Sequence, residues 1–345
     1  MSTTRPRAPL VLVALAVLLA TTACASSAPQ RGPAAAPAPA ARTPLRIPYS
    51  AIGGAMATIW IAKEGGYLAE EGFDVTMDYI ATSTTLTQAL LGGDAQIAMG
   101  GLEALVASNL AGADLVGLAV SSDRFLFRLY GAPGIRTLAD LRGKRIAVAR
   151  HGSTSDTAAH LLVRRAGLEP DRDVEMLPAG GNPEIYAALD SGLAQAALLS
   201  PPLGFKAEAA GFTTVVDMPA EDIPFHQSIL VSTRRYVAEQ EDVAQRVVRA
   251  YARGVARYLQ DREFFKQVLA QYTQLDDDDM LDRTWVMHQT VIPRVSYFRP
   301  GAIQIALDAL AQERPEARSA KPEDFVDERF LRELDQSGYI ASLYR

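Results

Sequence analysis

The sequence predicts an α/β protein built from two similar lobes, for three reasons. Short apolar segments alternate with helical segments joined by short loops, a pattern typical of parallel sheets covered by helices. The segment 89–98 recurs at 188–197 with six of ten positions identical, and each copy is a helix end, a glycine stop and a buried strand. Chance similarity in an alanine-rich chain is the alternative, but one repeat about 100 residues away favours two lobes over a solenoid. Composition changes after about Glu221, where a helical block begins.

The first lobe is expected to begin with a strand at 45–50 and a helix opened by Gly53-Gly54 that runs to about Leu68. Further expected elements are a strand at 73–80, a helix at 86–91 capped by 82–84, a strand at 95–99, a helix at 102–110 and a strand at 115–120.

The second lobe repeats this plan, with strands expected at 145–149, 173–178 and 195–199 and helices at 153–166 and 183–190. Apolar residues at helical spacing follow, including Val247, Tyr251 and Tyr258, and this C-terminal block is expected to pack back on the first lobe. The chain would then cross between lobes near 127–133 and near 219–228, and two crossings form a hinge.

Composition excludes several classes of protein. The chain has 345 residues, 48% of them hydrophobic and 21% charged, with a net charge of −6. It has too much apolar content for a disordered protein, and its acidic balance disfavours a nucleic-acid binder. Its single cysteine, Cys24, excludes an internal disulfide and a zinc site made from paired cysteines.

The N-terminus has the pattern of an export signal. Arg5 and Arg7 precede an apolar run over 8–23, which is too short to cross a ~30 Å hydrocarbon core and is typical of a signal peptide. Small residues before Cys24 resemble a bacterial lipobox, although Thr21 stands where leucine is usual. This resemblance implies cleavage after Ala23 and lipidation of Cys24. A plain signal peptide with an incidental cysteine is the alternative.

The expected organisation is therefore a signal peptide at 1–23, a lipidated cysteine with a linker rich in alanine and proline at 24–44, and two lobes. Lobe 1 would comprise 45–130 and 224–345, and lobe 2 would comprise 131–223. No later run approaches 18 apolar residues, so we expect no transmembrane helix.

The sequence offers little for catalysis. It has no phosphate-binding loop with Gly-Lys-Ser/Thr and no Gly-x-Ser-x-Gly elbow. Its four histidines are scattered, so no metal is expected, and the acidic run 276–279 is interpreted as a solvated turn before a helix. We expect no enzyme activity and no cofactor.

Helix N-termini that follow strand ends are the candidate site. In open α/β sheets the ligand crevice lies outside the carboxyl ends of the strands, and helix N-termini there bind anions. Such positions are 53–57, 81–84, 100–103, 151–156, 181–182 and 200–202. Most such loops in α/β proteins only cap helices, which is the alternative.

Five segments in order then resemble a known family: IWIAKEGGYLAEEGFDV at 59–75, QALLGGDAQIAMGG at 88–101, LADLRGKRIAV at 138–148, RHGSTSD at 150–156 and GLEPDRDV at 167–174. The chain resembles substrate-binding proteins of nitrate/sulfonate/taurine-type ABC transporters, which share the fold of the NMT1/THI5-like group. The resemblance implies a type II periplasmic-binding-protein-like fold, in which two α/β lobes joined by a two-strand hinge close on a ligand.

By position, this resemblance implies ligand contacts from both lobes. The residues are Ser50, Gly54, Met56, Ala57, Thr82, Ser83, Gly100 and Gly101 in the first lobe, and Arg150, Gly152, Ser153, Thr154, Asn182, Ser200 and His226 thereafter. Arg150 suits a carboxylate or sulfonate, because a guanidinium presents a planar fork. A surface salt bridge is its alternative role.

The resemblance implies a monomeric, exported, lipid-anchored protein that hands a small organic anion to the permease subunits of an ABC importer. A pyrimidine-like heterocycle is the second ligand class, with Tyr49, Trp60 and Phe225 as a possible stacking wall. A ligand sensor of the same fold and an exported enzyme are the remaining alternatives. The cysteine-rich iron motif of the related fungal pyrimidine synthases is impossible with one cysteine.

Overall fold

The computed structural model describes residues 42–80, 83–311 and 314–345. The predicted signal peptide, Cys24, most of the linker and Thr82 lie outside the described residues. No helix in the described ranges combines the length and apolar character needed to cross a membrane.

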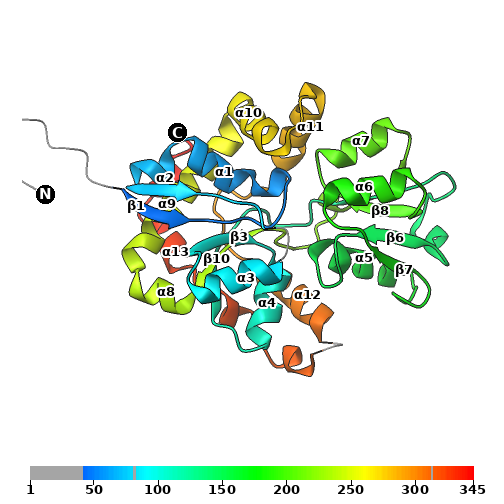
Figure 1. The fold of residues 1–345 in the computed structure, drawn as a ribbon, viewed down its shortest axis with the longest axis horizontal. Coiled ribbons are helices and arrows are strands. Elements are labelled where there is room, and N and C mark those ends of the chain that lie inside the picture. The colour runs from blue at the N-terminus through cyan, green and yellow to red at the C-terminus, as the bar shows by residue number, and fades with distance from the viewer. Residues whose placement is uncertain (1–41, 81–82, 312–313) are drawn as a thin grey trace, which may run out of the picture. The chain divides into compact units, whose positions relative to one another are not determined.

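The first lobe contains two small sheets that isolated bridges connect (Figure 1). In one, β1 (Thr43–Arg46) pairs in parallel with β2 (Phe73–Thr76). In the other, β10 (Ile229–Thr233) lies between β3 (Ile97–Gly100) and β4 (Leu115–Val120) and is antiparallel to both. Tyr49 bridges to Tyr79 and to Met99, which joins the two sheets edge to edge. Strands β3 and β4 are buried along their whole length, as expected for continuous apolar runs covered on both faces.

The second lobe contains one five-stranded sheet in the order β7-β6-β8-β5-β9. Its strands are β5 (Arg128–Gly131), β6 (Arg145–Val148), β7 (Glu175–Pro178), β8 (Ala196–Leu199) and β9 (Thr213–Asp217). Strand β6 is parallel to β7 and β8, whereas β5 is antiparallel to both β8 and β9. The two repeated segments of the sequence end in β3 and β8, one in each lobe.

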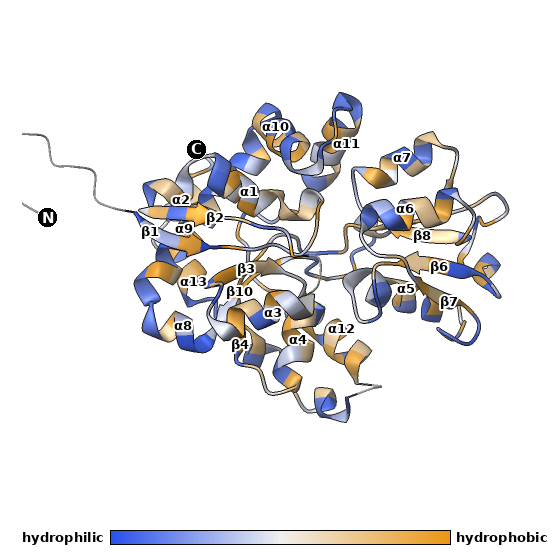
Figure 2. Ribbon diagram, viewed as in Figure 1, coloured by the Kyte–Doolittle hydropathy of each residue, from blue (hydrophilic) through white to orange (hydrophobic). Residues whose placement is uncertain are grey.

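Helices cover both groups of strands. Those before β10 are α1 (Ala57–Glu64), α2 (Tyr67–Glu70), α3 (Ser83–Gly92), α4 (Leu102–Leu110), α5 (Thr154–Arg165), α6 (Asn182–Asp190) and α7 (Leu203–Ala209), with 3-10 turns η1 (Gly54–Met56), η2 (Leu138–Leu141) and η3 (Met218–Ala220). Figure 2 shows polar residues on their outer faces and apolar residues toward the strands.

The C-terminal block consists of α8 (Arg234–Glu239), α9 (Glu241–Gln260), α10 (Arg262–Thr273), α11 (Asp278–His288), α12 (Pro300–Leu310), α13 (Arg329–Gln336) and α14 (Tyr339–Ser342), with turns η4 (Pro315–Arg318) and η5 (Pro322–Phe325). It packs on the first lobe, as predicted (Figure 1). The hydroxyl of Tyr251 on α9 donates to Val120 O at 3.0 Å, and its oxygen lies within hydrogen-bond distance of Thr58 Oγ1, at 3.1 Å.

Two connections join the lobes, at 121–127 and at 218–228. The second agrees with the predicted crossing. The first lies upstream of the predicted 127–133, because residues 128–131 already pair with β8 and β9 in the second sheet. Phe125 and Phe225, one from each connection, stack with ring centroids 3.9 Å apart. The lobe boundaries themselves stay a prediction.

Helices α1 and α9 approach closely at Gly254. A Cβ added there would lie 2.7 Å from Thr58 O and 2.8 Å from the Cβ of Ala62, whereas Gly92, at the end of α3, has no atom within 4 Å of such a Cβ. We predict that Gly254→Ala lowers the free energy of unfolding by about 1–3 kcal/mol, because the helices must separate. Gly92→Ala is the matched control and should leave stability unchanged or raise it by up to ~1 kcal/mol. Urea denaturation of both variants measures this, and equal stabilities would contradict the close packing.

Candidate ligand-binding site

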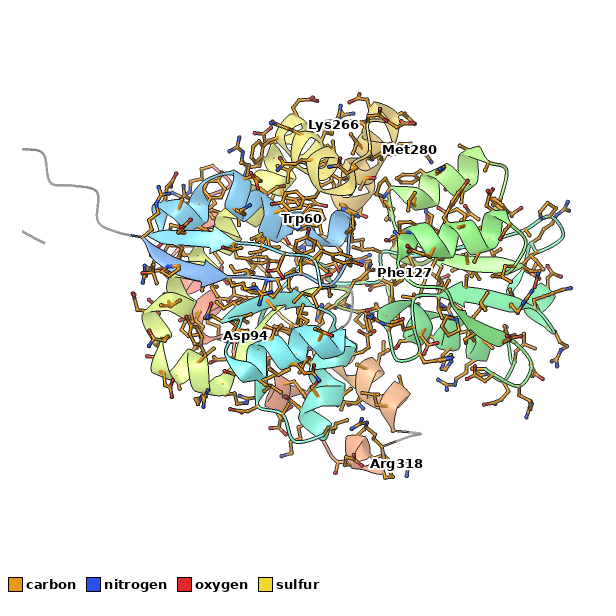
Figure 3. All side chains as sticks on the ribbon, in the orientation of Figure 1. Trp60, Asp94, Phe127, Lys266, Met280 and Arg318 are labelled. Carbon is orange, nitrogen blue, oxygen red and sulfur yellow. The ribbon has the colours of Figure 1, made fainter. Side chains whose placement is uncertain are left out.

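A cavity of about 350 Å³ lies between the lobes, at the carboxyl ends of strands from both. The first lobe contributes residues 50–53, 55–56, 79, 101 and 103–104. The second contributes 149–150, 152–155, 180–185 and 200, and the connections contribute 127 and 227–228. Figure 3 labels Phe127, which comes from the first connection. A cavity in the range of about 300–1,000 Å³ suits a small organic molecule.

The lobes touch across this cavity. A Cβ added at Gly53 would lie 3.7 Å from Ser200 Oγ, and one added at Gly181 would lie 3.9 Å from the hydroxyl of Tyr79. At the rim, Arg283 of α11 forms an ion pair with Glu208 of α7. The two lobes are therefore in contact beside the cavity, and residues of both lobes line it.

Most residues predicted for the site line the cavity. These are Ser50, Met56, Gly101, Arg150, Gly152, Ser153, Thr154, Asn182 and Ser200. Gly54, Ala57, Gly100 and His226 do not line it. Ser83 begins α3, but its side chain is outside the described part of the structure. Contact of any of these residues with a ligand stays a prediction.

Many polar groups of the loop 150–156 form hydrogen bonds within the loop. Gly152 has φ +69°, the left-handed conformation that glycine adopts without strain. Its N–H donates to Asp156 Oδ2 at 2.9 Å, and Ser153 Oγ caps α5 by accepting from Asp156 N at 3.3 Å. The Ser153 oxygen thus serves as acceptor in the helix cap, and the prediction that its hydroxyl donates to a ligand stays a prediction.

Glu103 is a site residue that the sequence prediction did not select. It lies in the first turn of α4, is 3% exposed and accepts a hydrogen bond from Thr154 Oγ1 of the second lobe at 2.9 Å. Its other oxygen, Oε1, is buried without a partner among the described residues. Burial raises the pKa of Glu103 to about 7, and the charge of Asp156 acts in the same direction. This carboxyl is therefore neutral in a large fraction of molecules near pH 7.

The cavity does not have the charge expected of a pure anion site. Within the described lining, Arg150 is the one lysine or arginine, and two glutamates, Glu103 and Glu184, line the same cavity. Asn182 and Ser200 bond to one another, with Asn182 Nδ2 donating to Ser200 Oγ at 2.7 Å. The lining thus combines the positive charge of Arg150 with the acidic group of Glu184 and the partly neutral carboxyl of Glu103.

The aromatic wall differs from the predicted one. Trp60 is fully buried and stacks on Tyr272 with centroids 4.4 Å apart, and Phe225 is fully buried against Phe125. Neither lines the cavity, and Tyr49 does not line it either. The apolar faces come from Ile52, Met56, Phe127 and Tyr79. Tyr79 lies at the end of the predicted strand 73–80 and just after the observed β2, so its position at a strand end was the signal for it.

His226 belongs to the connections between the lobes. Its Nδ1 donates to Ser122 O at 2.7 Å and its Nε2 accepts from Arg299 N at 2.9 Å, so both nitrogens are used and the ring is the neutral tautomer. The ring is fully buried, which lowers the pKa of His226 to about 4. The prediction that it contacts ligand is not supported by this position, because no ring nitrogen is left for one.

His288, at the end of α11, packs against Gly54 in the first lobe, on the side away from the cavity. Its ring contacts Gly54 so closely that a Cβ there would clash, and its Nδ1 hydrogen-bonds the hydroxyl of Tyr258. Burial lowers the pKa of His288 to about 3. Gly54 is thus required for packing under the loop, although it does not line the cavity.

Comparison with known proteins gives the family. The sequence profile described as NMT1/THI5 like matches residues 55–263, which is more than half of the chain. The chain belongs to this family. The resemblance stated from the sequence is therefore confirmed for the NMT1/THI5-like family. No curated protein matched the sequence.

Solved structures confirm the periplasmic-binding-protein-like α/β fold. A protein from Bordetella bronchiseptica RB50 is 20% identical with a TM-score of 0.73, covering 85% of this chain and 97% of that one. The periplasmic aliphatic sulphonate binding protein SsuA of Escherichia coli is 19% identical (TM-score 0.68, 83% and 92% covered). The periplasmic nitrate-binding protein NrtA of Synechocystis PCC 6803 is 15% identical (TM-score 0.70, 88% and 91% covered). At these identities the likeness concerns the fold.

The neutral His226 makes stability depend on pH. Its folded pKa of about 4 lies below its ordinary 6.5, so its contribution is complete above pH 6.5 and is lost as pH falls toward 4. We predict that wild type loses about 3 kcal/mol through this group over that window. His226→Gln should show a correspondingly smaller loss.

Urea denaturation at several pH values measures this dependence. Lys144→Gln is the matched control, because Lys144 is an exposed residue away from His226, and this variant should leave the wild-type profile unchanged. A His226→Gln profile parallel to that of wild type would show that His226 is not buried as described.

Proposed function

We propose that this protein is an extracytoplasmic solute-binding protein that captures a small organic solute between its lobes and delivers it to an ABC importer. The observation that carries the proposal is the cavity itself, which loops at the strand ends of both sheets enclose. Two structures of this fold are, by their own descriptions, a periplasmic sulphonate binding protein and a periplasmic nitrate-binding protein. Binding without chemistry fits a cavity whose lining carries one cation, two carboxyls and hydroxyl groups in place of a nucleophile–base pair.

The two connections at 121–127 and 218–228 would act as the hinge. Ligand contacts from both lobes stabilise the closed state by differential affinity, since the open state offers only one wall. We further propose lobe boundaries close to those predicted from the sequence, with β5 (128–131) assigned to lobe 2 because it pairs with β8 and β9. We also propose a monomeric, lipid-anchored protein outside the cytoplasm.

The lining favours an uncharged heterocycle of the pyrimidine type as the solute. Glu184 shares the lining with Arg150, and Tyr79, Phe127 and Met56 offer apolar faces to a flat ring. The volume of about 350 Å³ also exceeds what nitrate needs. A sulfonate, taurine or carboxylate is the second candidate, which Arg150 favours because its guanidinium matches such a group.

We predict the following for a panel of 4-amino-2-methylpyrimidine, taurine, ethanesulfonate and nitrate. The pyrimidine should raise the Tm of the protein by mass action and bind by calorimetry. Arg150→Gln should leave pyrimidine affinity within about threefold but weaken any anion at least tenfold, that is by about 1.4 kcal/mol.

Arg136→Gln is the control, because Arg136 is an exposed arginine away from the cavity. Anion binding that exceeds pyrimidine binding and depends on Arg150 would establish the second candidate. Binding of no panel member would contradict both ligand classes.

The anchor has its own prediction. If Cys24 is the lipidated N-terminus, Cys24→Ala should release the protein from the membrane fraction with unchanged ligand affinity, because the linker 24–44 separates anchor and cavity. Mass spectrometry of the membrane-bound protein should find an acylated cysteine at its start. A mature chain that begins at Ala25 or later would instead indicate a plain signal peptide.

A further inference from the structure

A buried carboxyl group bridges the two lobes at the wall of the cavity. Glu103 lies at the start of α4, directly after β3 of the first lobe, and Thr154 lies at the start of α5, directly after β6 of the second. The Thr154 hydroxyl donates to Glu103 Oε2 at 2.9 Å, although the residues are 51 positions apart. The bond can exist only while the lobes are together.

Closure removes this carboxyl group from water. Glu103 is 3% exposed, and its Oε2 accepts from Thr154 at 2.9 Å. Thr157 of α5 also hydrogen-bonds this carboxyl, but burial outweighs both hydroxyls. An ionised carboxylate in such a place is destabilised, since two hydroxyls do not replace its hydration. Separation of the lobes would remove Thr154 and return the carboxyl to solvent.

We infer that Glu103 is a proton-linked latch of the cleft, whose neutral carboxyl favours the closed lobes and whose ionisation favours opening. This inference rests on the proposed function, because it concerns the hinge closure that captures the solute. It adds a pH regulation of the same site, in which low pH favours the closed cleft and higher pH favours the open one.

The charged groups around Glu103 act in opposing directions. Asp156 of α5, itself 5% exposed, disfavours a second negative charge beside it. His151 and His160 lie 3.8 and 3.7 Å from Asp156 Oδ1 and, when protonated, compensate Asp156. Arg150 and Glu184 line the same cavity. Arg283 and Glu208 form an ion pair between the same two lobes at the rim. The Glu103–Thr154 hydrogen bond is therefore one of several contacts between the lobes, and it modulates closure.

Linkage gives the size of the effect. Burial raises the pKa of Glu103 from its ordinary 4.5 to about 7 in the closed form, and the open form should have the ordinary value. The closed-to-open ratio should then fall about 30-fold between about pH 5.5 and about pH 8.5.

Spin-label distances in the ligand-free full chain test this. Labels at Leu91→Cys in α3 and Leu193→Cys before β8, both exposed positions in different lobes, report opening in a Cys24→Ser background. The wild-type background should show a larger share of long distances at about pH 8.5 than at about pH 5.5, by the 30-fold ratio above.

Three variants separate the latch from other causes. Glu103→Gln keeps the shape of the side chain without its charge, so it should remain closed at both pH values. Thr154→Val should be more open at both pH values but keep the pH dependence, because it leaves the carboxyl in place. Glu239→Gln is the matched control, an exposed glutamate on α8, and should behave as wild type.

Distances that do not change with pH in the wild-type background, or that change equally in Glu103→Gln, would overturn the inference. The proposed function is judged separately by the ligand panel. If a solute binds but the distances do not depend on pH, the latch is contradicted and the proposed function stands. If the distances depend on pH but no panel member binds, the proposed ligand classes are contradicted and the latch stands.

Discussion

The insertion of β10 between β3 and β4 is the constraint on which the rest of the fold depends. Because residues 229–233 are the central strand of the first sheet, the chain must return there after it has built the second lobe. That return creates the second connection, places the C-terminal helices on the first lobe and leaves the strand ends of the two sheets facing one cavity. A chain that ended after β9 would leave β3 and β4 unpaired at a buried edge, with backbone groups unsatisfied.

Much of this arrangement could be predicted from the sequence, because it depends on local patterns. Glycine stops, helix caps and apolar runs located most strands, and the repeated segment at 89–98 and 188–197 indicated two lobes. The first connection was placed too late, since the short strand 128–131 has no local signal that assigns it to one sheet rather than the other. Strand pairing is decided by partners far away in the sequence, in this case β8 and β9.

The site could be predicted in position but less well in chemistry. Nine predicted residues line the cavity because strand ends in an α/β sheet must converge there. The hydrogen-bond partners of these residues are distant in the sequence, so local patterns do not predict them. From the sequence, Thr154 is a hydroxyl at a helix start that could bind a ligand, but in the structure it hydrogen-bonds Glu103 of the other lobe. The sequence likewise places His226 in the cleft, but in the structure Ser122 and Arg299 hydrogen-bond both of its ring nitrogens. Trp60 was expected in a stacking wall, but it is buried in the core, where it stacks on Tyr272, more than 200 residues later.

The stacked pair Phe125–Phe225 has a consequence for how the protein unfolds. These rings belong to one continuous apolar cluster that includes Leu86 and Val120 of the first lobe and Ile146 and Leu198 of the second. The lobes therefore share a core through the hinge, and melting of either would expose apolar surface of the other. Cooperativity of this kind should couple the lobes into a single thermal transition. An intermediate with only one lobe folded would expose the apolar residues that the two lobes share, so it should not accumulate.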